Sequence, residues 1–535
     1  MSTAVVPPRT ASRIAALLDR LVCSISRHER LWLCAAFAVF ALLLIYSAVS
    51  VPLSFDEFFT IFISRLPSLS AMLHAMPADS QPPLQYLLTH LSLQWLGTSE
   101  LGARLPEMIA YLAASWLAWR IVRVHGTRVQ ALFALLLMLG ASTGRILLSG
   151  FSVFGLSFNA RPYELTLAFT ALAFLCWQTA TLYKRNRLLP LTGLACAIAG
   201  AILSHHYGFL QIGPALLAGE VIRFRSHRRI DLGVLAAIAA GLLAFPFTIP
   251  LALRTRTLLD SAILHNTHFF ARPSLLDFIC WPAMLPWLLF LPLTLLACLP
   301  PSAKTLNSPT PELPAVPRHE MAAAIALALI VPAQILLAAV TTGYFQPRYA
   351  VDTTLGLTLL CAWAWPRTGR LRSAAEPILA VLCLGFLLVA AVDLCFAEAR
   401  HPAGRRQLVQ SAVPPLLLNA PEALPIVAAD PFLYVPQWWY APPAIQQRLI
   451  FLSDIDYAVQ RPAFLAELSV WIDRADLPEP IATYSSFTAS HPRFVLLCTG
   501  KPRDNWILPR LRESGWHLTV LQQSGADILY QADHP

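Results

Sequence analysis

Charged residues are scarce in this chain. Of its 535 residues only 13% are charged, whereas 56% are hydrophobic, which excludes an ordinary soluble globular protein. The ten cysteines show no Cys-x-x-Cys spacing, so the sequence indicates neither a disulfide framework nor a zinc site. It also has no glycine-rich phosphate-binding loop, which argues against a nucleotide cofactor.

Long apolar runs are abundant instead. A helix needs about 20 apolar residues to cross a membrane. Runs of roughly this length lie at 31–51, 105–122, 129–148, 163–182, 188–203, 209–222, 232–251, 278–299, 321–340, 351–365 and 374–394. These eleven runs predict a polytopic α-helical membrane protein.

The net charge of +9 reflects membrane topology rather than a nucleic-acid partner. Basic residues cluster in alternate loops, at 120–128, 184–187, 223–229 and 367–372, and in the N-terminal tail, as the positive-inside rule requires. An odd number of spans then places the N-terminus in the cytoplasm and the C-terminal tail outside. Segment 82–96 is also apolar, but counting it as a span would reverse every later loop. We therefore expect it to form a helix in the outer interface.

Three parts follow from this pattern: a cytoplasmic tail at 1–30, a membrane body at 31–394 with an outer loop at 52–104, and an extracytoplasmic domain at 395–535. No cleavable signal peptide is evident, so the first span is expected to remain as an anchor. Several prolines predict an irregular inner connector at 300–320. In the tail, strand-like stretches (425–429, 494–498, 517–521 and 528–530) alternate with helical ones (462–473 and 506–514), which predicts a small α/β domain.

Side chains suited to chemistry gather in the segments assigned to the outer face. They are Asp56, Glu57, Asp79, Gln81, His90, Arg104, Asn159, Arg161, Glu164, His205, His206, Tyr207, His265, His268, Arg348 and Tyr349. The inner loops contain basic residues but few such combinations. Because charged groups held at a membrane are costly, this asymmetry favours a reaction centre on the outer side.

Three carboxylates lie in the outer loop. Ser54-x-x-Glu57 is a capping-box pattern, so Glu57 has a structural interpretation beside a catalytic one. Asp56 is not needed for the cap, and apolar surroundings would raise its pKa towards that of a general base. Asp79 precedes two prolines, where it is either a turn residue or, together with Asp56, a ligand of a divalent metal ion.

Two arginines accompany predicted helix starts on the same side. Arg161 and Arg348 both suit a phosphate clamp, because the guanidinium fork matches phosphate oxygens. For Arg161 the alternative is headgroup snorkelling, and the neighbouring Tyr349 also fits an interfacial aromatic.

Two further clusters have competing interpretations. His205 and His206 end a span at the outer boundary, and two successive histidines favour a hydrogen-bonding or metal role. Trp438-Trp439-Tyr440 in the tail fits glycan stacking, although core packing of a small domain is the commoner use of such residues.

The order of these motifs resembles the dolichyl-phosphate-mannose–protein mannosyltransferase-like superfamily, whose bacterial relatives include the lipid A aminoarabinose transferases. The motifs are Phe55-Asp56-Glu57, Asp79-x-x-Pro82-Pro83-Leu84-x-Tyr86, Gly97-x-x-Glu100-x-x-x-Arg104-Leu105-Pro106 and Ala160-Arg161-Pro162-Tyr163. The resemblance is clearest over residues 31–210, and Pro347-Arg348-Tyr349 and the tail support it. Two positions depart from the pattern: Asn159 stands where relatives often have Glu, and Gln81 where a basic or His residue often precedes the proline pair.

The resemblance implies a GT-C-like glycosyltransferase, inverting and of the hexosyl- or pentosyltransferase type, in a bacterial inner membrane. Its donor would be a polyprenyl-phosphate sugar in the outer leaflet, and its acceptor a protein, lipid or glycan. The implied roles are base or acceptor positioning for Asp56, with Glu57 beside it, and donor-phosphate binding for Arg161, Arg348 and Arg104. Asp79, His205, His206 and Tyr349 would lie near the substrate, with a divalent metal ion near Asp56 and Asp79.

Two other classes of function remain open from the residues. A lipid-linked sugar transporter would need polar residues across the bilayer midplane and repeat symmetry, whereas the spans here are apolar centrally. A membrane-anchored assembly protein would bind its partner through the tail and would keep its function without Asp56.

Overall fold

The structure is a computed structural model of the chain. It describes residues 9–76, 79, 81–141, 159–183, 185–259, 288–290, 315–341, 347–363, 375–400, 402–421, 423–428, 431–454, 457, 481–498 and 506–534.

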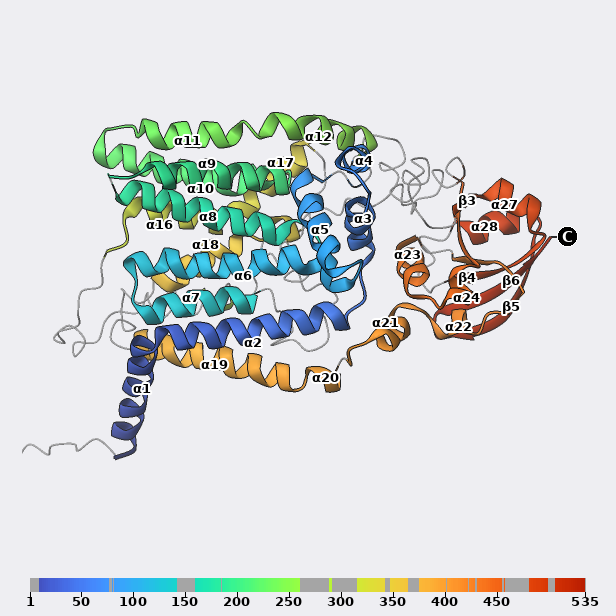
Figure 1. The fold of residues 1–535 in the computed structure, drawn as a ribbon, viewed down its shortest axis with the longest axis horizontal. Coiled ribbons are helices and arrows are strands. Elements are labelled where there is room, and N and C mark those ends of the chain that lie inside the picture. Colours follow the sequence, from blue (N-terminus) through green and yellow to red (C-terminus); the bar gives the residue numbers. More distant parts are fainter. Residues whose placement is uncertain are drawn as a thin grey trace, which may run out of the picture.

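A bundle of roughly aligned helices forms the larger part of the molecule (Figure 1). Its members are α2 (Glu29–Ser50), α6 (Glu100–His125), α7 (Arg128–Ala141), α8 (Tyr163–Leu182), α9 (Leu188–Ser204), α10 (Gly208–His227), α11 (Leu232–Leu242), α12 (Phe245–Leu259), α16 (Arg318–Ala328), α17 (Ile330–Thr341), α18 (Thr353–Trp363) and α19 (Ala375–Cys395). They coincide with the apolar runs because only a helix satisfies its own backbone polar groups in lipid. The buried core includes nearly all of α7 and α18.

The number of spans stays a prediction. Among the described residues, four helices are long and apolar enough to cross a membrane: Glu29–Ser50, Tyr163–Leu182, Leu232–Leu251 and Ala375–Cys395. A fifth arises if Arg318–Ala328 and Ile330–Leu336, which meet at a bend of 49°, form one broken span. Other helices in the bundle are shorter or end in charged residues, and most of the predicted run at 278–299 lies outside the described residues.

Three short helices close one end of the bundle. These are α3 (Phe55–Ser64), α4 (Leu69–Ala75) and α5 (Pro83–Leu96), and they connect α2 to α6. The helix expected at 82–96 is thus confirmed as α5, which packs against α3 and α6. Its polar residues Gln85, Thr89 and Ser92 are buried against these neighbours, which explains how a polar stripe persists in an apolar segment.

At the opposite end of the bundle, α1 (Arg9–Arg27) runs across the bundle helices rather than along them (Figure 1). The sequence predicted only a basic tail here. The expected irregular connector at 300–320 ends earlier than predicted, since α16 begins at Arg318; residues 301–314 lie outside the described part.

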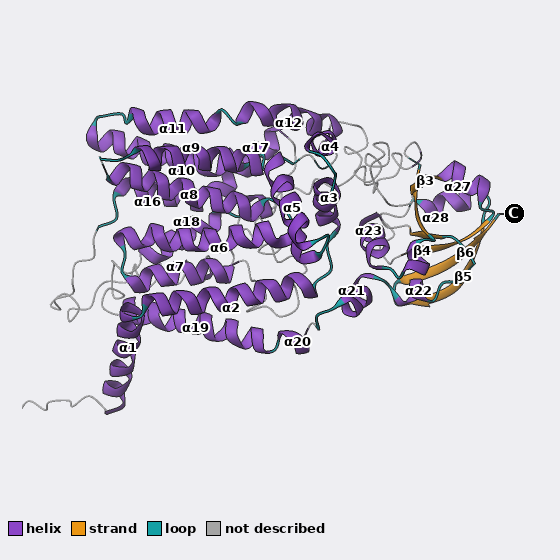
Figure 2. Ribbon diagram, viewed as in Figure 1, coloured by secondary structure: helices purple, strands orange, loops and turns teal. Residues whose placement is uncertain are grey.

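The C-terminal part is an α/β domain beside the α3–α5 end of the bundle (Figure 2). Its described strands are β1 (Ile426–Ala428), β2 (Leu449–Ser453), β3 (Ile481–Thr483), β4 (Arg493–Cys498), β5 (His517–Ser524) and β6 (Asp527–Asp533), in the sheet order β3-β2-β1-β4-β6-β5. The first four positions in this order are parallel, and β6 and β5 form an antiparallel hairpin at one edge. Gly525, with φ 59°, makes the hairpin turn, a conformation that favours glycine.

Short helices accompany the sheet and connect it to α19. They are α20 (Ala397–Arg400), α21 (Arg405–Ala412), α22 (Pro415–Leu418), α23 (Pro431–Tyr440), α24 (Pro443–Gln446), α27 (Tyr484–Ser490) and α28 (Ile507–Glu513). The predicted α/β domain is confirmed, as are all four predicted strands and the helix at 506–514. Strands β2 and β3 were missed, and the helix expected at 462–473 lies outside the described residues.

Candidate functional site

The first turn of α3 carries both carboxylates of the Asp56-Glu57 pair. Glu57 Oε2 accepts the backbone N–H of Ser54 at 2.8 Å, so the predicted link from Glu57 back to the helix start is present. Its Oε1 accepts the N–H of Ala160 at 2.9 Å. Glu57 is 1% exposed. These contacts assign Glu57 to holding two distant segments together.

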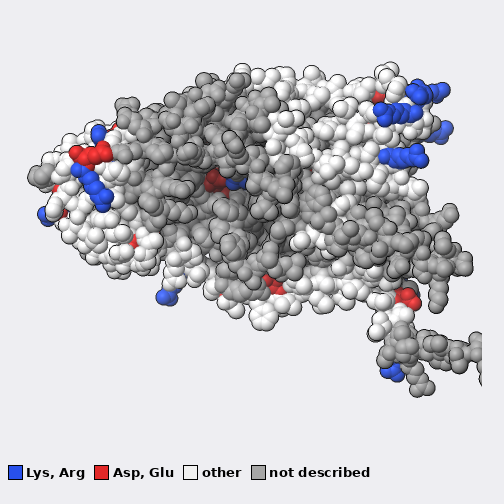
Figure 3. Space-filling model, turned by 180° about the vertical axis from the view of Figure 1, so that it is seen from behind, with Lys and Arg blue, Asp and Glu red and all other residues white. Residues whose placement is uncertain are grey.

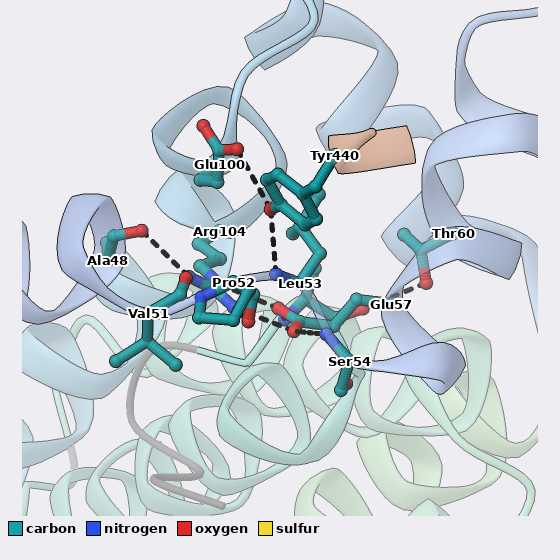
Figure 4. Close-up of polar contacts among 11 residues, drawn as sticks. Ala48, Val51, Pro52, Leu53, Ser54, Glu57, Thr60, Glu100, Arg104 and Tyr440 are labelled. Carbon is teal, nitrogen blue, oxygen red and sulfur yellow. Dashed lines mark hydrogen bonds and ion pairs between the residues drawn. The ribbon is translucent and has the colours of Figure 1, made fainter. Parts of the chain in front are cut away.

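Arg104, on α6, completes the surroundings of Glu57 (Figure 4). Its Nε and Nη2 donate to the two Glu57 oxygens at 2.7 and 2.8 Å. Its remaining N–H groups reach the carbonyls of Ala48 and Val51, both at 2.7 Å, and of Pro52 at 3.0 Å. A guanidinium has five N–H donors, and all are used here. Donor-phosphate binding by Arg104 stays a prediction; in this arrangement all its N–H donors are engaged and the residue is 1% exposed.

The C-terminal domain reaches the same place through α23. The Tyr440 hydroxyl accepts the N–H of Leu53 at 2.9 Å and donates to Glu100 at 2.9 Å (Figure 4). Next to it, the Trp439 ring contacts Phe58 and Phe62 of α3, with centroids 5.4 and 6.2 Å apart. Packing, the commoner use expected for this aromatic triplet, is thus confirmed for these two residues. Their partners lie in the outer loop as well as in their own domain.

Asp56 has a different partner from Glu57, an arginine from far along the chain. Arg348 Nη1 lies 2.8 Å from Asp56 Oδ2. Arg348 belongs to η5 (Pro347–Ala350), a short 3₁₀ turn between α17 and α18. The Asp56 and Arg348 side chains remain 29% and 20% exposed, so a ligand can approach both.

A second ion pair lies beside the first. Arg161 Nη1 is 2.6 Å from Asp79 Oδ2 and 3.1 Å from the backbone carbonyl of Asp56. The Tyr86 hydroxyl, from α5, donates to the same Asp79 oxygen at 2.7 Å. Arg161 and Asp79 are each 7% exposed. The structure thus brings Asp56, Asp79, Arg161 and Arg348 together, although they come from four separate segments.

The two carboxylates have opposite pKa shifts. Burial alone would raise the pKa of Asp56, but the positive charges of Arg348 and Arg161 outweigh burial and lower it below the usual value. For Asp79, burial outweighs Arg161 and Tyr86 and raises the pKa. The expectation of a raised pKa for Asp56 is therefore wrong, because the sequence did not reveal that two arginines face it.

Histidine and tyrosine rings line the neighbouring side of this cluster. The His205 ring lies 5.3 Å from Tyr349 and 5.7 Å from Tyr163, and Tyr207 stacks on Tyr349 at 5.4 Å. Arg348 lies over the Tyr163 ring, 5.5 Å from its centroid. Burial, aided by the charges of His206, Arg161 and Arg348, holds the pKa of His205 well below its usual value, which keeps the ring neutral. Of the two histidines, His205 is buried and His206 is half-exposed.

The residues as placed do not fit the divalent cation that the sequence suggested for Asp56 and Asp79. Within the described part of the chain, no group of three or more His, Cys, Asp or Glu side chains is arranged to hold a metal ion. Both carboxylates already face arginines, whose positive charge disfavours a nearby cation.

Several residues of this site were not singled out from the sequence. Tyr86 and Glu100 appeared only as members of motifs, Tyr163 only beside Arg161, and Tyr440 only in the aromatic triplet. A tyrosine in an apolar segment looks like packing, and its hydroxyl partner is visible only once the chain is folded.

Comparison with known proteins gives two matches of different kinds. Residues 80–253 match the family model described as dolichyl-phosphate-mannose-protein mannosyltransferase. The fold matches ArnT from Cupriavidus metallidurans, solved with bound undecaprenyl phosphate (TM-score 0.55) and in the apo state (TM-score 0.56), each at 14% sequence identity. Each match covers 94% of this chain, and 97% and 98% of the two ArnT chains. No match was found among the curated proteins.

The two matches overlap on the segment that contributes α5, α6 and Arg161 to the site. The fold is matched along almost the whole chain, including the C-terminal α/β domain. The resemblance predicted from the sequence motifs is thus confirmed: over residues 80–253 the chain is similar to the dolichyl-phosphate-mannose-protein mannosyltransferases, and it has the fold of ArnT.

Proposed function

We propose that this protein is a membrane glycosyltransferase that moves a sugar from a polyprenyl-phosphate donor to an acceptor at the outer face of a bacterial inner membrane. The observation that carries the proposal is the Asp56–Arg348 pair, which is partly exposed and lies beside Arg161 at the end of an ArnT-like helix bundle. ArnT itself was solved with undecaprenyl phosphate. Arginine forks match phosphate oxygens, and carboxylates can accept a proton.

In the proposed reaction, the acceptor nucleophile attacks the anomeric carbon while the bond from that carbon to the phosphate oxygen breaks. The phosphate leaves with the electron pair, and the acceptor's proton passes to the Asp56 carboxylate. A single displacement inverts the anomeric carbon. Arg348 and Arg161 stabilise the charge that develops on the leaving phosphate, which is the larger need because a phosphate requires no acid to leave.

The ion pair gives this scheme a built-in order. While Arg348 contacts Asp56, the lowered pKa makes Asp56 a weak base. A donor phosphate that attracts Arg348 would weaken that contact and raise the pKa of Asp56. Asp56 would then become a stronger base only when donor is bound. Arg161 is more deeply buried and stays with Asp79, so we assign Arg348 the direct phosphate contact and Arg161 a supporting one.

The test uses the purified full-length protein and labelled polyprenyl-phosphate sugars. We expect Asp56→Asn to abolish sugar release, by at least ~100-fold, while binding of polyprenyl phosphate is retained. Asp454→Asn, in the C-terminal domain and paired with Arg510, is the matched control and should turn over like the wild type. Equal turnover of Asp56→Asn and wild type would place the base elsewhere. No turnover by the wild type with any donor would overturn the transferase in favour of transport or assembly.

A further inference from the structure

The N-terminal helix α1 carries an apolar stripe that is only partly covered by the bundle. At its C-terminal end Ile25 is fully buried, and Leu21 and Val22 pack against the core. Here α1 lies against α19 and α7. One to three turns earlier on the same side of the helix, Ile14 and Leu17 are 59% and 63% exposed. Among the described residues, a stripe that begins against the bundle therefore continues without a packing partner.

The position of α1 explains where this stripe faces. The chain leaves helical geometry at His28 (φ −115°, ψ 37°) between α1 and α2, which allows a sharp change of direction. In Figure 1, α1 lies at the end of the bundle that is farther from the C-terminal domain. It extends beyond α19, the outermost helix. Ile25 faces the apolar body of the bundle. The continuation of its stripe therefore extends past the bundle on the same side, where lipid would surround a bundle embedded in a membrane.

Arginines follow one edge of that stripe. Arg13, Arg20 and Arg27 are spaced by seven residues, which places them on one side of the helix. All three are exposed, and none has an ion-pair partner among the described residues. Lys and Arg side chains also gather at the same end of the bundle, where α10 ends (Figure 3). A helix with an apolar face and a basic edge suits the boundary between acyl chains and anionic headgroups.

We propose that α1 is an in-plane helix that binds the anionic phospholipid headgroups of the inner membrane surface, with Ile14 and Leu17 in the acyl region and Arg13, Arg20 and Arg27 at the phosphates. The charge complementarity selects anionic lipid as the partner, since each arginine near such a surface strengthens binding roughly fivefold. The proposal does not depend on the transferase activity.

The test is hydrogen exchange of the full-length protein in nanodiscs of phosphatidylcholine alone or mixed with phosphatidylglycerol. We expect amides of residues 13–20 to exchange at least ~10-fold more slowly in the anionic discs, because headgroup binding suppresses fraying of α1. Replacing Arg13, Arg20 and Arg27 by Gln should remove this difference. The matched control replaces Arg225, Arg228 and Arg229, three exposed arginines at the end of α10, by Gln and should retain it.

Three outcomes would overturn the proposal. One is equal exchange in both lipids for the wild type. Another is an unchanged difference in the triple Gln variant. The third is protection that depends on protein concentration rather than on lipid charge, which would indicate that the stripe of α1 packs on a second copy of the chain. The double variant Ile14→Ser/Leu17→Ser tests the orientation of the helix. If the wild type exchanges more slowly in anionic discs and this variant loses that slow exchange, the in-plane orientation is supported.

Discussion

Two adjacent carboxylates, Asp56 and Glu57, have opposite surroundings. Glu57 is buried with both oxygens bound to Arg104 and to backbone N–H groups, and such a charge is kept only where it is fully paired. Asp56, one residue earlier, is partly exposed and pairs with Arg348 instead. A shift of one position on a helix turns a side chain by about 100°, which is enough to give two adjacent carboxylates different partners.

Arg348, together with Arg161, lowers the pKa of Asp56 against the effect of burial. Because the folded pKa of Asp56 is lowered, the ion pair stabilises the protein above the unfolded pKa, and this contribution is lost as pH falls through the folded pKa. Arg348→Gln removes the main charge that lowers the pKa, so the pKa of Asp56 should rise. We expect the acid limb of the kcat/KM profile to move to higher pH.

The same variant should lower kcat/KM by roughly 10- to 100-fold, the usual effect of losing a charged hydrogen bond to phosphate. The pH profile of sugar release, measured with saturating acceptor, provides both readouts. Arg225→Gln, an exposed arginine on α10, is the control. An acid limb that stays in place would show that Asp56 does not control the pH dependence.

At the scale of elements, α3 lies between two bodies. Its first turn carries the site, and its following residues Phe58 and Phe62 pack against Trp439 of α23. The Tyr440 hydroxyl connects the backbone of Leu53, just before α3, with Glu100 at the start of α6. The C-terminal domain thus contributes directly to the position of the turn that presents Asp56.

Tyr440→Phe removes only this hydroxyl. We expect kcat to fall roughly tenfold, because small displacements of a catalytic group are costly, while the KM for donor changes little. Tyr434→Phe is the matched control: Tyr434 lies on the same helix, is equally buried and contacts Phe451 of the sheet. Steady-state kinetics of both variants, with Tm in detergent as a check on folding, distinguishes a positioning role of the Tyr440 hydroxyl from a general loss of stability. Equal kinetic effects of the two changes would contradict a positioning role for Tyr440.

At the scale of elements, the sequence predicted helices and strands well wherever the length or pattern of an apolar run determines the element. Where the runs fall on described residues they coincide with bundle helices, although 321–340 holds two, and most of 278–299 lies outside the described part. Apolar stretches gave β1, β4, β5 and β6. Strand β3 is three residues long and half-exposed, so it has no such pattern. The bend between α16 and α17 was also missed, because the apolar run continues through it.

The site was predicted less completely for a physical reason. The predicted membrane topology placed Asp56, Asp79, Arg161 and Arg348 on one face. It did not indicate which arginine pairs with which carboxylate. Arg104 looked like the other two arginines, and only its five acceptors in the folded chain distinguish it. Pairing between residues hundreds of positions apart leaves no local pattern.

At the scale of the whole molecule, the site and α1 lie at opposite ends of the bundle (Figure 1). Basic side chains gather at the α1 end (Figure 3), as expected for a cytoplasmic surface. The topology that places the site and the C-terminal domain outside remains a prediction.

Cysteine labelling tests that topology. In a cysteine-free background, Ser524→Cys, in the exposed hairpin of β5 and β6, should react with a membrane-impermeant maleimide on intact spheroplasts. Ser226→Cys, exposed at the end of α10, should react only after the membrane is permeabilised. The reverse pattern would place Asp56 on the cytoplasmic side and rule out an outer-leaflet donor.

The contacts of Glu57 also impose a sequence of events during synthesis. Ala48, Val51 and Pro52 leave carbonyls without helical partners where the first span ends, and the arginine that satisfies them emerges about 50 residues later. The N–H that completes the Glu57 carboxylate comes later still, from Ala160. Until the ribosome has passed that codon, Glu57 must stay hydrated and the loop cannot adopt its final form. The cluster around Glu57 therefore closes only after Ala160 has been synthesised, well after the first apolar segment has left the ribosome.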